Sequence, residues 1–229
     1  AWGNLARKLA HEIKNPLTPI QLTIDRIKNK YLGQIDNDEQ NNFKENLKII
    51  NNQIKQIENL VNEFSDFARM PKPIFKNNNL SAILKENIKL LSEIDKSINI
   101  VLINKSNEIN LKCDKEQIGR VFFNLIKNSI ESIQQKNEKN PDFDKKILIE
   151  ILSNNDHINF TLVDNGVGFN SIKNDIKEIL NPYYTTKKNG TGLGLSIVNK
   201  IINDHNGELI FHSLPNGAKI EIDFKLNGN

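Results

Sequence analysis

A histidine, an acidic residue and an amide lie close together near the start of the 229-residue chain, as His11, Glu12 and Asn15. At about 100° per residue, His11 lies about 200° around a helix from Leu9 and Ile13, so it points away from the apolar stripe that they mark. An exposed neutral imidazole can attack phosphorus, and a neighbouring carboxylate can orient the ring and take up its proton. An exposed histidine on an amphipathic helix is more often an ordinary surface residue, so this group alone does not establish a reaction.

Two prolines, Pro16 and Pro19, follow on the same predicted helix. Neither has an N–H to donate to the carbonyl four residues earlier, so we expect the helix to be kinked or loosened just beyond His11. A nucleophile at such a place has room for a large incoming partner.

A second polar group lies on a predicted helix in the middle of the chain. There Asn124, Asn128 and Glu131 share one face through their spacing of four and three. Side-chain amide oxygens can bind Mg²⁺, which prefers oxygen ligands and keeps water and substrate phosphates in its coordination shell. Polar residues on one helix face are more often simply solvated, so the spacing permits a magnesium site without establishing one.

Two glycine-rich segments come after this helix. In the first, Asp164 ends a strand-like run and precedes Gly166 and Gly168, a pattern that also suits an ordinary hairpin turn. The second, residues 190–195, places glycines before an apolar helix, where backbone N–H groups can approach phosphate oxygens. No β-α-β unit with a downstream ribose-binding acid accompanies it, so a dinucleotide-binding fold is not indicated.

Two long helices are predicted early in the chain, because apolar residues recur there in steps of three and four, as in a coiled-coil seam. The stripes are Leu5, Leu9, Ile13, Leu17, Ile20, Ile24, Ile27 and Tyr31, then Phe43, Leu47, Ile50, Ile54, Ile57, Val61, Phe64 and Ala68. A polar stretch at 33–38 separates them, so we expect an antiparallel hairpin. One hairpin buries too little alone, so we expect a homodimer in which two copies form a four-helix bundle.

Pro71 and Pro73 end the second helix, because proline lacks an N–H and disfavours helical geometry in the residue before it. The predicted organisation is a helical hairpin over 1–70, a linker over 71–74 and a second domain over 75–229. Its predicted helices are 80–94, 115–136, 174–180 and 193–205, its strands 98–103, 108–112, 146–153, 157–163, 207–213 and 218–225, and its polar loop 137–145. The strands come mostly in adjacent pairs, so the fold class is α+β, with a mixed, mainly antiparallel sheet covered by helices on one face.

Composition limits the classes of partner and the cellular compartment that we expect for this chain. Hydrophobic residues make up 38% and charged residues 26% of the chain, as in ordinary globular proteins. The net charge of +3 comes from interleaved charges without a basic stripe, so we expect no nucleic-acid partner. Cys113 is the only cysteine, which excludes an internal disulfide and fits a reducing, cytoplasmic compartment. No apolar run approaches the about 18 residues that cross a bilayer, so we expect no membrane contact here, and the chain opens as if cut from a longer protein.

The run His11-Glu12-Ile13-Lys14-Asn15-Pro16-Leu17 resembles the H-box of sensor histidine kinases. The segments 124–131, 164–168, 182–184 and 190–195 are similar, in order and spacing, to the N, G1, F and G2 boxes of that family's ATP-binding domain. The resemblance covers nearly the whole chain. It implies a dimerisation and phospho-acceptor hairpin followed by an α/β sandwich of the Bergerat or GHKL ATPase type. The implied reaction is ATP- and Mg²⁺-dependent phosphorylation of His11, then transfer to an aspartate of a response regulator.

The resemblance also implies a role for individual residues. His11 accepts the phosphoryl group, Glu12 is the base that activates it, and Asn15 helps to place water for dephosphorylating the regulator. Asn128 binds Mg²⁺, and Asp164 binds the amino group of adenine. The other implied nucleotide-site residues are Asn124, Glu131, Gly166, Gly168, Tyr183, Lys187, Gly190, Thr191, Gly192, Leu193 and Gly194, with Lys188 an alternative to Lys187 for neutralising phosphate charge.

The chain departs from the commonest family pattern at two positions. Tyr183 and Tyr184 stand where a phenylalanine is usual, which keeps an aromatic ring but could alter lid docking. Ser129 replaces a frequent alanine, a small-for-small change that we expect to be tolerated. Three further histidines share no metal-ligand spacing and are interpreted as incidental: His157, His205 and His212.

The local sequence around His11, around Glu63–Pro73 and around Pro182–Lys187 resembles the NtrY branch, membrane sensor kinases of nitrogen regulation. The resemblance implies a regulator of the NtrX type and a parent protein anchored in the bacterial inner membrane. Other interpretations stay open: another nitrogen-regulation-like kinase, or a phosphatase-dominant or non-catalytic dimeric scaffold. An ATPase of the same nucleotide fold, such as a chaperone or DNA-repair type, would lack the phospho-accepting hairpin.

Overall fold

The computed structural model describes residues 2–104, 108–169, 176–187 and 190–226. The chain divides into two compact units, Ala1–Pro71 together with Lys187–Leu193, and Lys72–Thr186 together with Gly194–Asn229. Each unit has buried apolar residues of its own. No helix among the described residues is both long enough and apolar enough to cross a bilayer.

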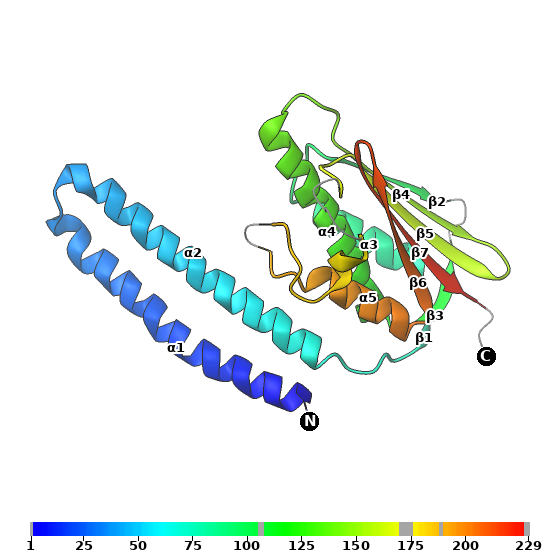
Figure 1. Cartoon of the computed structure of the whole chain (residues 1–229), viewed down its shortest axis with the longest axis horizontal. Coiled ribbons are helices and arrows are strands. Elements are labelled where there is room, and N and C mark those ends of the chain that lie inside the picture. Colours follow the sequence, from blue (N-terminus) through cyan, green and yellow to red (C-terminus); the bar gives the residue numbers. More distant parts are fainter. Residues whose placement is uncertain (1, 105–107, 170–175, 188–189, 227–229) are drawn as a thin grey trace. The chain divides into compact units, whose positions relative to one another are not determined.

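Two long helices form a hairpin in the first unit (Figure 1). Its elements are helix α1 (Trp2–Tyr31), the 3-10 turn η1 (Leu32–Gln34) and helix α2 (Asn37–Ala68). Pro16 and Pro19 both lie inside α1, and the hydroxyl of Thr23 donates to the carbonyl of Pro19 at 2.8 Å. The hairpin is confirmed, whereas the kink beyond His11 stays a prediction.

The apolar stripe that the hairpin buries agrees with the predicted one in part: Leu17, Ile24, Leu47, Ile54 and Val61 are buried as predicted, whereas Ala6 and Ala10, also buried, were not in the predicted stripe. Leu9 and Ile13, which the sequence places in the seam, are instead 42% and 43% exposed. The apolar face of α1 is wider than one helix contact can cover, so the residues beside the buried stripe stay at the surface. A broad apolar face is therefore left uncovered in a single chain.

The second unit is built on a five-stranded sheet with helices on one face (Figure 1). Its strands are β2 (Asn99–Asn104), β4 (Lys146–Ser153), β5 (His157–Asp164), β6 (Gly207–Leu214) and β7 (Gly217–Lys225), in the order β2-β4-β5-β7-β6. The helices are α3 (Leu80–Ser92), α4 (Lys115–Lys139) and α5 (Gly194–Asp204). Among these described strands, β2 and β4 pair in parallel, and the other pairs are antiparallel. The predicted α+β class with a mainly antiparallel sheet is thus confirmed.

A small second sheet was not anticipated. Strand β1 (Lys76–Asn79) pairs with β3 (Asn110–Cys113), and Lys76 lies opposite Cys113. The expectation that adjacent strands pair is therefore wrong for β2 and β3, because β1 takes β3 as its partner and β2 joins β4. β1 consists of one lysine and three asparagines, so it has no apolar alternation to reveal it.

Two predicted elements need correction. Helix α4 continues to Lys139, so the first residues of the predicted polar loop 137–145 are helical. The helix predicted at 174–180 is a short 3-10 turn, η2 (Ile176–Leu180), and residues 174 and 175 lie outside the described residues. Polar residues suit an exposed helical end as well as a loop, which is why composition misplaced the first boundary.

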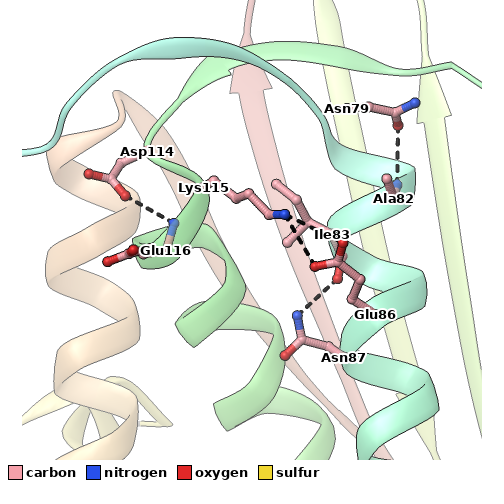
Figure 2. A network of polar contacts seen from close by, with 8 residues as sticks. All are labelled: Asn79, Ala82, Ile83, Glu86, Asn87, Asp114, Lys115 and Glu116. Carbon is pink, nitrogen blue, oxygen red and sulfur yellow. Dashed lines mark hydrogen bonds and ion pairs between the residues drawn. The ribbon is translucent and has the colours of Figure 1, made fainter.

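Polar caps start the two helices α3 and α4 (Figure 2). The side chain of Asn79 accepts from the N–H of Ala82 at 3.2 Å. Asp114 accepts from the N–H groups of Glu116 and Gln117 at 3.0 and 3.1 Å, which satisfies N–H groups that have no partner within the helix. These caps fix where α4 begins and hence the phase of the residues along it.

Candidate functional site

Asp164 is a buried carboxylate at the end of β5. The strand alternates between buried and more exposed positions, and the alternation ends on Asp164, which is only 4% exposed. Its Oδ1 accepts from the N–H of Gly166 at 2.9 Å, and its Oδ2 accepts from the hydroxyl of Ser129 at 3.0 Å. The sheet therefore directs a carboxylate inward, and Ser129 of α4 supplies one of its hydrogen-bond donors.

The surroundings of Asp164 act on its charge in opposite directions. Burial raises the pKa of this carboxyl above the ordinary value of 3.8, because the charged form loses its hydration. The N–H of Gly166, the hydroxyl of Ser129, the N–H of Ala218 and the charge of Lys136 lower it and only partly oppose the burial. The result is a carboxylate with few contacts to water and a strong tendency to accept further hydrogen bonds.

The loop after Asp164 passes so close to neighbouring backbone that two of its positions must be glycine. A β-carbon on Gly166 would lie 2.7 Å from the backbone carbonyl carbon of Ser132 in α4. Gly168 has φ +63, and a β-carbon there would lie 2.3 Å from the carbonyl oxygen of Gly217. The predicted role of Gly166 and Gly168 in shaping the site has this geometric basis, since a side chain on either would push the loop away from its neighbours.

Asn165, between these residues, has a structural role. Its Oδ1 accepts from the N–H of Lys146 at 3.0 Å, which ties the loop to the start of β4. Lys136 of α4 donates to the carbonyl of Asn165 at 2.7 Å and lies 4.7 Å from the ring centroid of Phe143. Sequence reasoning missed Ser132, Lys136 and Gly217, which carry no motif and meet the loop only through the fold.

The polar residues that share one face of α4 are half-buried. Asn124, Asn128 and Glu131 are intermediate in exposure, while the other face of the helix is buried. A β-carbon on Gly194 would lie 3.7 Å from Oδ1 of Asn124, so the start of α5 adjoins this face. Glu131 forms an ion pair with Lys127 at 3.7 Å.

The donor set on this face fits a magnesium ion that also binds phosphate. Two amide oxygens and one carboxylate are hard oxygen ligands of the kind Mg²⁺ prefers, and too few to enclose it without phosphate and water. In the described ranges, no group of three His, Cys, Asp or Glu side chains is arranged to hold a metal ion. The residues therefore suit a cation that arrives with a phosphorylated ligand.

Lys187–Leu193 groups with the helical unit. Within it, Gly192 has φ +71, the N–H of Leu193 donates to the hydroxyl of Thr191 at 3.4 Å, and the N–H of Gly190 donates to the carbonyl of Lys187 at 3.2 Å. Leu193 is fully buried. Lys188, the alternative to Lys187, lies outside the described residues.

Tyr183 has an unusual backbone for its residue type. It has φ +70, follows η2 and is 56% exposed, and the N–H of the next residue, Tyr184, donates to the carbonyl of Asn181 at 3.2 Å. Bulky residues rarely adopt this left-handed conformation, which costs about 1–3 kcal/mol. The aromatic residue of the predicted F box is thus displayed at the surface by a strained turn.

The predicted phospho-acceptor lies on the surface of α1. His11, Glu12 and Asn15 are all exposed, whereas Ala10 and Leu17 are only 3% and 7% exposed. The structure thus brings these three side chains to one accessible stretch of the helix. An accessible imidazole next to a carboxylate can act as a nucleophile toward phosphorus.

Two family models match the chain. Residues 113–228 match the model described as histidine kinase-, DNA gyrase B- and HSP90-like ATPase. The chain belongs to this family. Residues 1–73 match the model described as the His Kinase A (phospho-acceptor) domain. A phospho-acceptor domain and an ATPase domain thus follow one another, which confirms the resemblance to a histidine-kinase core.

Two curated relatives of the chain have NtrY in their names. A putative NtrY-like sensor histidine kinase of Rickettsia bellii (strain RML369-C) is 36% identical over 227 residues, which cover 99% of this chain and 36% of the relative. The nitrogen regulation protein NtrY of Azorhizobium caulinodans is 33% identical over 232 residues, which cover 100% of this chain and 29% of the relative. The chain therefore spans about a third of the length of these relatives.

Solved histidine kinases share the fold. The catalytic domain of histidine kinase ThkA is 25% identical, with a TM-score of 0.57 over 66% of this chain and 95% of that one. ThkA in complex with the response regulator TrrA is 26% identical, with a TM-score of 0.67 over 98% of this chain and 61% of that one. These likenesses extend from the ATPase domain to the helical hairpin.

Proposed function

We propose that this chain is the catalytic core of an NtrY-like sensor histidine kinase, in which His11 is phosphorylated from ATP and then donates the phosphoryl group to an aspartate of a response regulator. The observation that carries the proposal is the exposure of His11 on a helix that buries Ala10 and Leu17, in a chain with an ATPase domain. The proposed domains are the hairpin 1–70, the linker 71–74 and the ATP-binding domain 75–229.

The proposed nucleophile is an imidazole nitrogen of His11. Its lone pair forms a bond to the γ-phosphorus while the bond from that phosphorus to the bridging oxygen breaks and ADP leaves. Glu12 is the proposed base for the ring proton. Its ion pair with Lys8 spans 4.0 Å between exposed side chains, and such pairs are weak, so the carboxylate stays available.

The proposed ATP site surrounds Asp164 and the polar face of α4. Asp164 would accept a hydrogen bond from the adenine amino group, and Gly166 and Gly168 let the loop approach α4 and β7 closely. Asn128 would hold Mg²⁺, with Asn124 and Glu131 supporting it. When bound, Mg²⁺ would neutralise phosphate charge during the transfer.

A homodimer is the proposed assembly. Leu9, Ile13, Ile20 and Ile57 are each 42–45% exposed in the single chain, and they lie beside the buried stripe of the hairpin. So many exposed apolar side chains on one pair of helices indicate a surface that a partner covers. A second copy of the hairpin would cover it and complete a four-helix bundle.

The remaining proposals concern the partner and the parent protein. A regulator of the NtrX type is proposed as the acceptor, with Asn15 placing water for the reverse, dephosphorylating activity. The parent is proposed to be a sensor anchored in the bacterial inner membrane, with this part in the cytoplasm. Nucleic acid is not among the proposed partners.

Incubation with γ-labelled ATP and Mg²⁺ tests the proposal. Wild type is expected to gain label that is stable in alkali and labile in acid, while His11→Gln and Asn128→Ala gain none. His212→Gln is the matched control, because His212 pairs with Glu221 on the sheet and has no proposed chemistry. Label persisting in His11→Gln would contradict the proposal.

The scaffold alternative predicts a different result. A protein that binds ATP without gaining label, yet removes phosphate from a phosphorylated receiver domain, would be phosphatase-dominant. In that case Asn15→Ala should abolish the phosphatase activity while leaving ATP binding intact.

A further inference from the structure

We propose that Ser129 is a specificity-determining residue, which holds the Asp164 carboxylate so that it selects a nucleobase with a 6-amino group. The inference rests on the proposed ATP-binding function and assigns a role to a residue that sequence reasoning treated as a neutral replacement of alanine.

The two side chains make a closed local contact. Ser129 is 2% exposed on α4, Asp164 is 4% exposed at the end of β5, and the hydroxyl lies 3.0 Å from Oδ2. An ionised carboxylate has no proton to donate and can only accept hydrogen bonds, so Ser129 must be the donor. Alanine at this position would leave Oδ2 without this donor in a site that water barely reaches.

Ser129 and Gly166 together fix the plane of the carboxylate. The hydroxyl of Ser129 donates to Oδ2, and the N–H of Gly166 donates to Oδ1 at 2.9 Å. Rotation of the carboxylate about its terminal bond would break both contacts. With its plane fixed, the carboxylate presents its remaining acceptor capacity in set directions to whatever base lies against it.

A fixed ionised acceptor discriminates between purines by the group at position 6. An amino group donates to it, whereas a 6-oxo group places two acceptors against each other in a site with little water. Sites built to pair with a donor reject an analogue that lacks the donor, because a buried polar group is left unpaired. Without Ser129 the carboxylate can turn or take up a proton, and a protonated carboxyl would donate to a 6-oxo group.

The test compares the affinities of ATP and inosine triphosphate for the whole chain. Binding is measured by calorimetry in EDTA, so that the result does not depend on the proposed Mg²⁺ site. The ratio of the two affinities is expected to fall about tenfold in Ser129→Ala, chiefly through weaker ATP binding, and to recover in Ser129→Thr, which restores the hydroxyl.

The matched control is Ser81→Ala. Ser81 is equally buried, at 1% exposed, but its hydroxyl accepts from the amide of Asn104 at 2.8 Å, away from Asp164. Its loss is expected to lower stability and leave the ATP-to-inosine-triphosphate ratio unchanged.

The outcomes separate the two proposals. The role of Ser129 is overturned if Ser129→Ala leaves the ratio of the two affinities unchanged. It is also overturned if Ser129→Ala weakens the binding of both nucleotides equally and Ser129→Thr does not restore it. In both cases the proposed function stands. Wild type that binds neither nucleotide overturns the proposed function and this inference with it.

Discussion

Nε2 of His205 accepts a hydrogen bond from the backbone N–H of Asp114 at 3.0 Å, which joins the end of α5 to the start of α4. Nδ1 of the same ring lies 2.8 Å from the carbonyl of Ile201, and the ring of Phe75 lies 5.1 Å away. An N–H can only donate and a carbonyl can only accept, so the ring must be neutral with its proton on Nδ1. His205, interpreted from the sequence as incidental, is thus a structural link in the second unit.

This geometry predicts the less common neutral tautomer for His205. Nitrogen-15 NMR of the side chains at pH 8 should show a protonated Nδ1 and an unprotonated Nε2 for His205. The exposed ring of His11 is the internal comparison and should show exchange between tautomers. An Nε2-protonated His205 would contradict the contact with Asp114.

Asp114→Ala should destabilise the second unit more than Asn79→Ala does. Asp114 accepts from the N–H groups of Ile74, Glu116 and Gln117. Asn79 caps α3 by accepting from the N–H of Ala82, and Figure 2 shows this bond beside the one from Glu116 to Asp114. We expect Asn79→Ala to cost about 1 kcal/mol and Asp114→Ala about 2 kcal/mol, measured by urea unfolding at pH 7. Equal costs would show that the additional contacts of Asp114, to Ile74 and Gln117, contribute nothing.

The cost of Asp114→Ala should shrink in acid. Burial alone would raise the pKa of Asp114, but the hydrogen bonds from the N–H groups of Ile74, Gln117 and Glu116 outweigh it and lower the pKa below 3.8. A lowered pKa means that this stability is present above the unfolded value and is lost as pH falls through the folded one. The difference between wild type and variant should therefore narrow below pH 3.8, and a constant difference would contradict it.

The sequence predicted the elements that carry a periodic pattern. Ile147, Ile149 and Ile151 alternate in β4, so the strand was predicted with its observed bounds. By contrast, the bond between Ser129 and Asp164 joins residues 35 positions apart, and only the packing of α4 on β5 brings them together. The first part of the α1 seam was misplaced, with Leu9 and Ile13 predicted where Ala10 is buried, because apolar residues on a wide helix face do not say which of them one neighbouring helix will cover.

Gly217→Ala should disrupt the nucleotide site, whereas Gly33→Ala should be harmless. Gly217 has φ +120, and a β-carbon there would lie 1.8 Å from the carbonyl oxygen of Asp164. Nothing lies within 4 Å of a β-carbon on Gly33. We expect Gly217→Ala to cost at least about 3 kcal/mol and to weaken ATP binding, and Gly33→Ala to change stability by less than about 1 kcal/mol. Circular dichroism melts and ATP titrations would measure both, and a stable Gly217→Ala that binds ATP normally would contradict the contact.

Asp164→Asn should gain stability relative to wild type as pH rises. Burial raises the pKa of Asp164, so the folded protein holds this proton more tightly than the unfolded chain does. The stability that this group gives to the wild type therefore decreases as pH rises from 3.8, the unfolded pKa, to the raised folded pKa. Above that pH it is constant. Urea unfolding without nucleotide should show the difference growing in favour of the variant over that window. A difference independent of pH would mean that the carboxyl ionises as easily in the folded protein as in the unfolded one.

Cys113 should be almost unreactive until the second unit opens. The residue is fully buried, and burial raises the pKa of its thiol from 9.0 to about 11, so little of it is thiolate at pH 8. Ellman's reagent should modify the folded protein at least about a hundredfold more slowly than the chain in 6 M guanidinium, and faster as denaturant promotes opening. The matched control is Ser153→Cys in a Cys113→Ala background, because residue 153 is exposed at the end of β4 and should react at nearly the unfolded rate. Rapid labelling of Cys113 in the native chain would show that the β1–β3 sheet opens far more often than its burial implies.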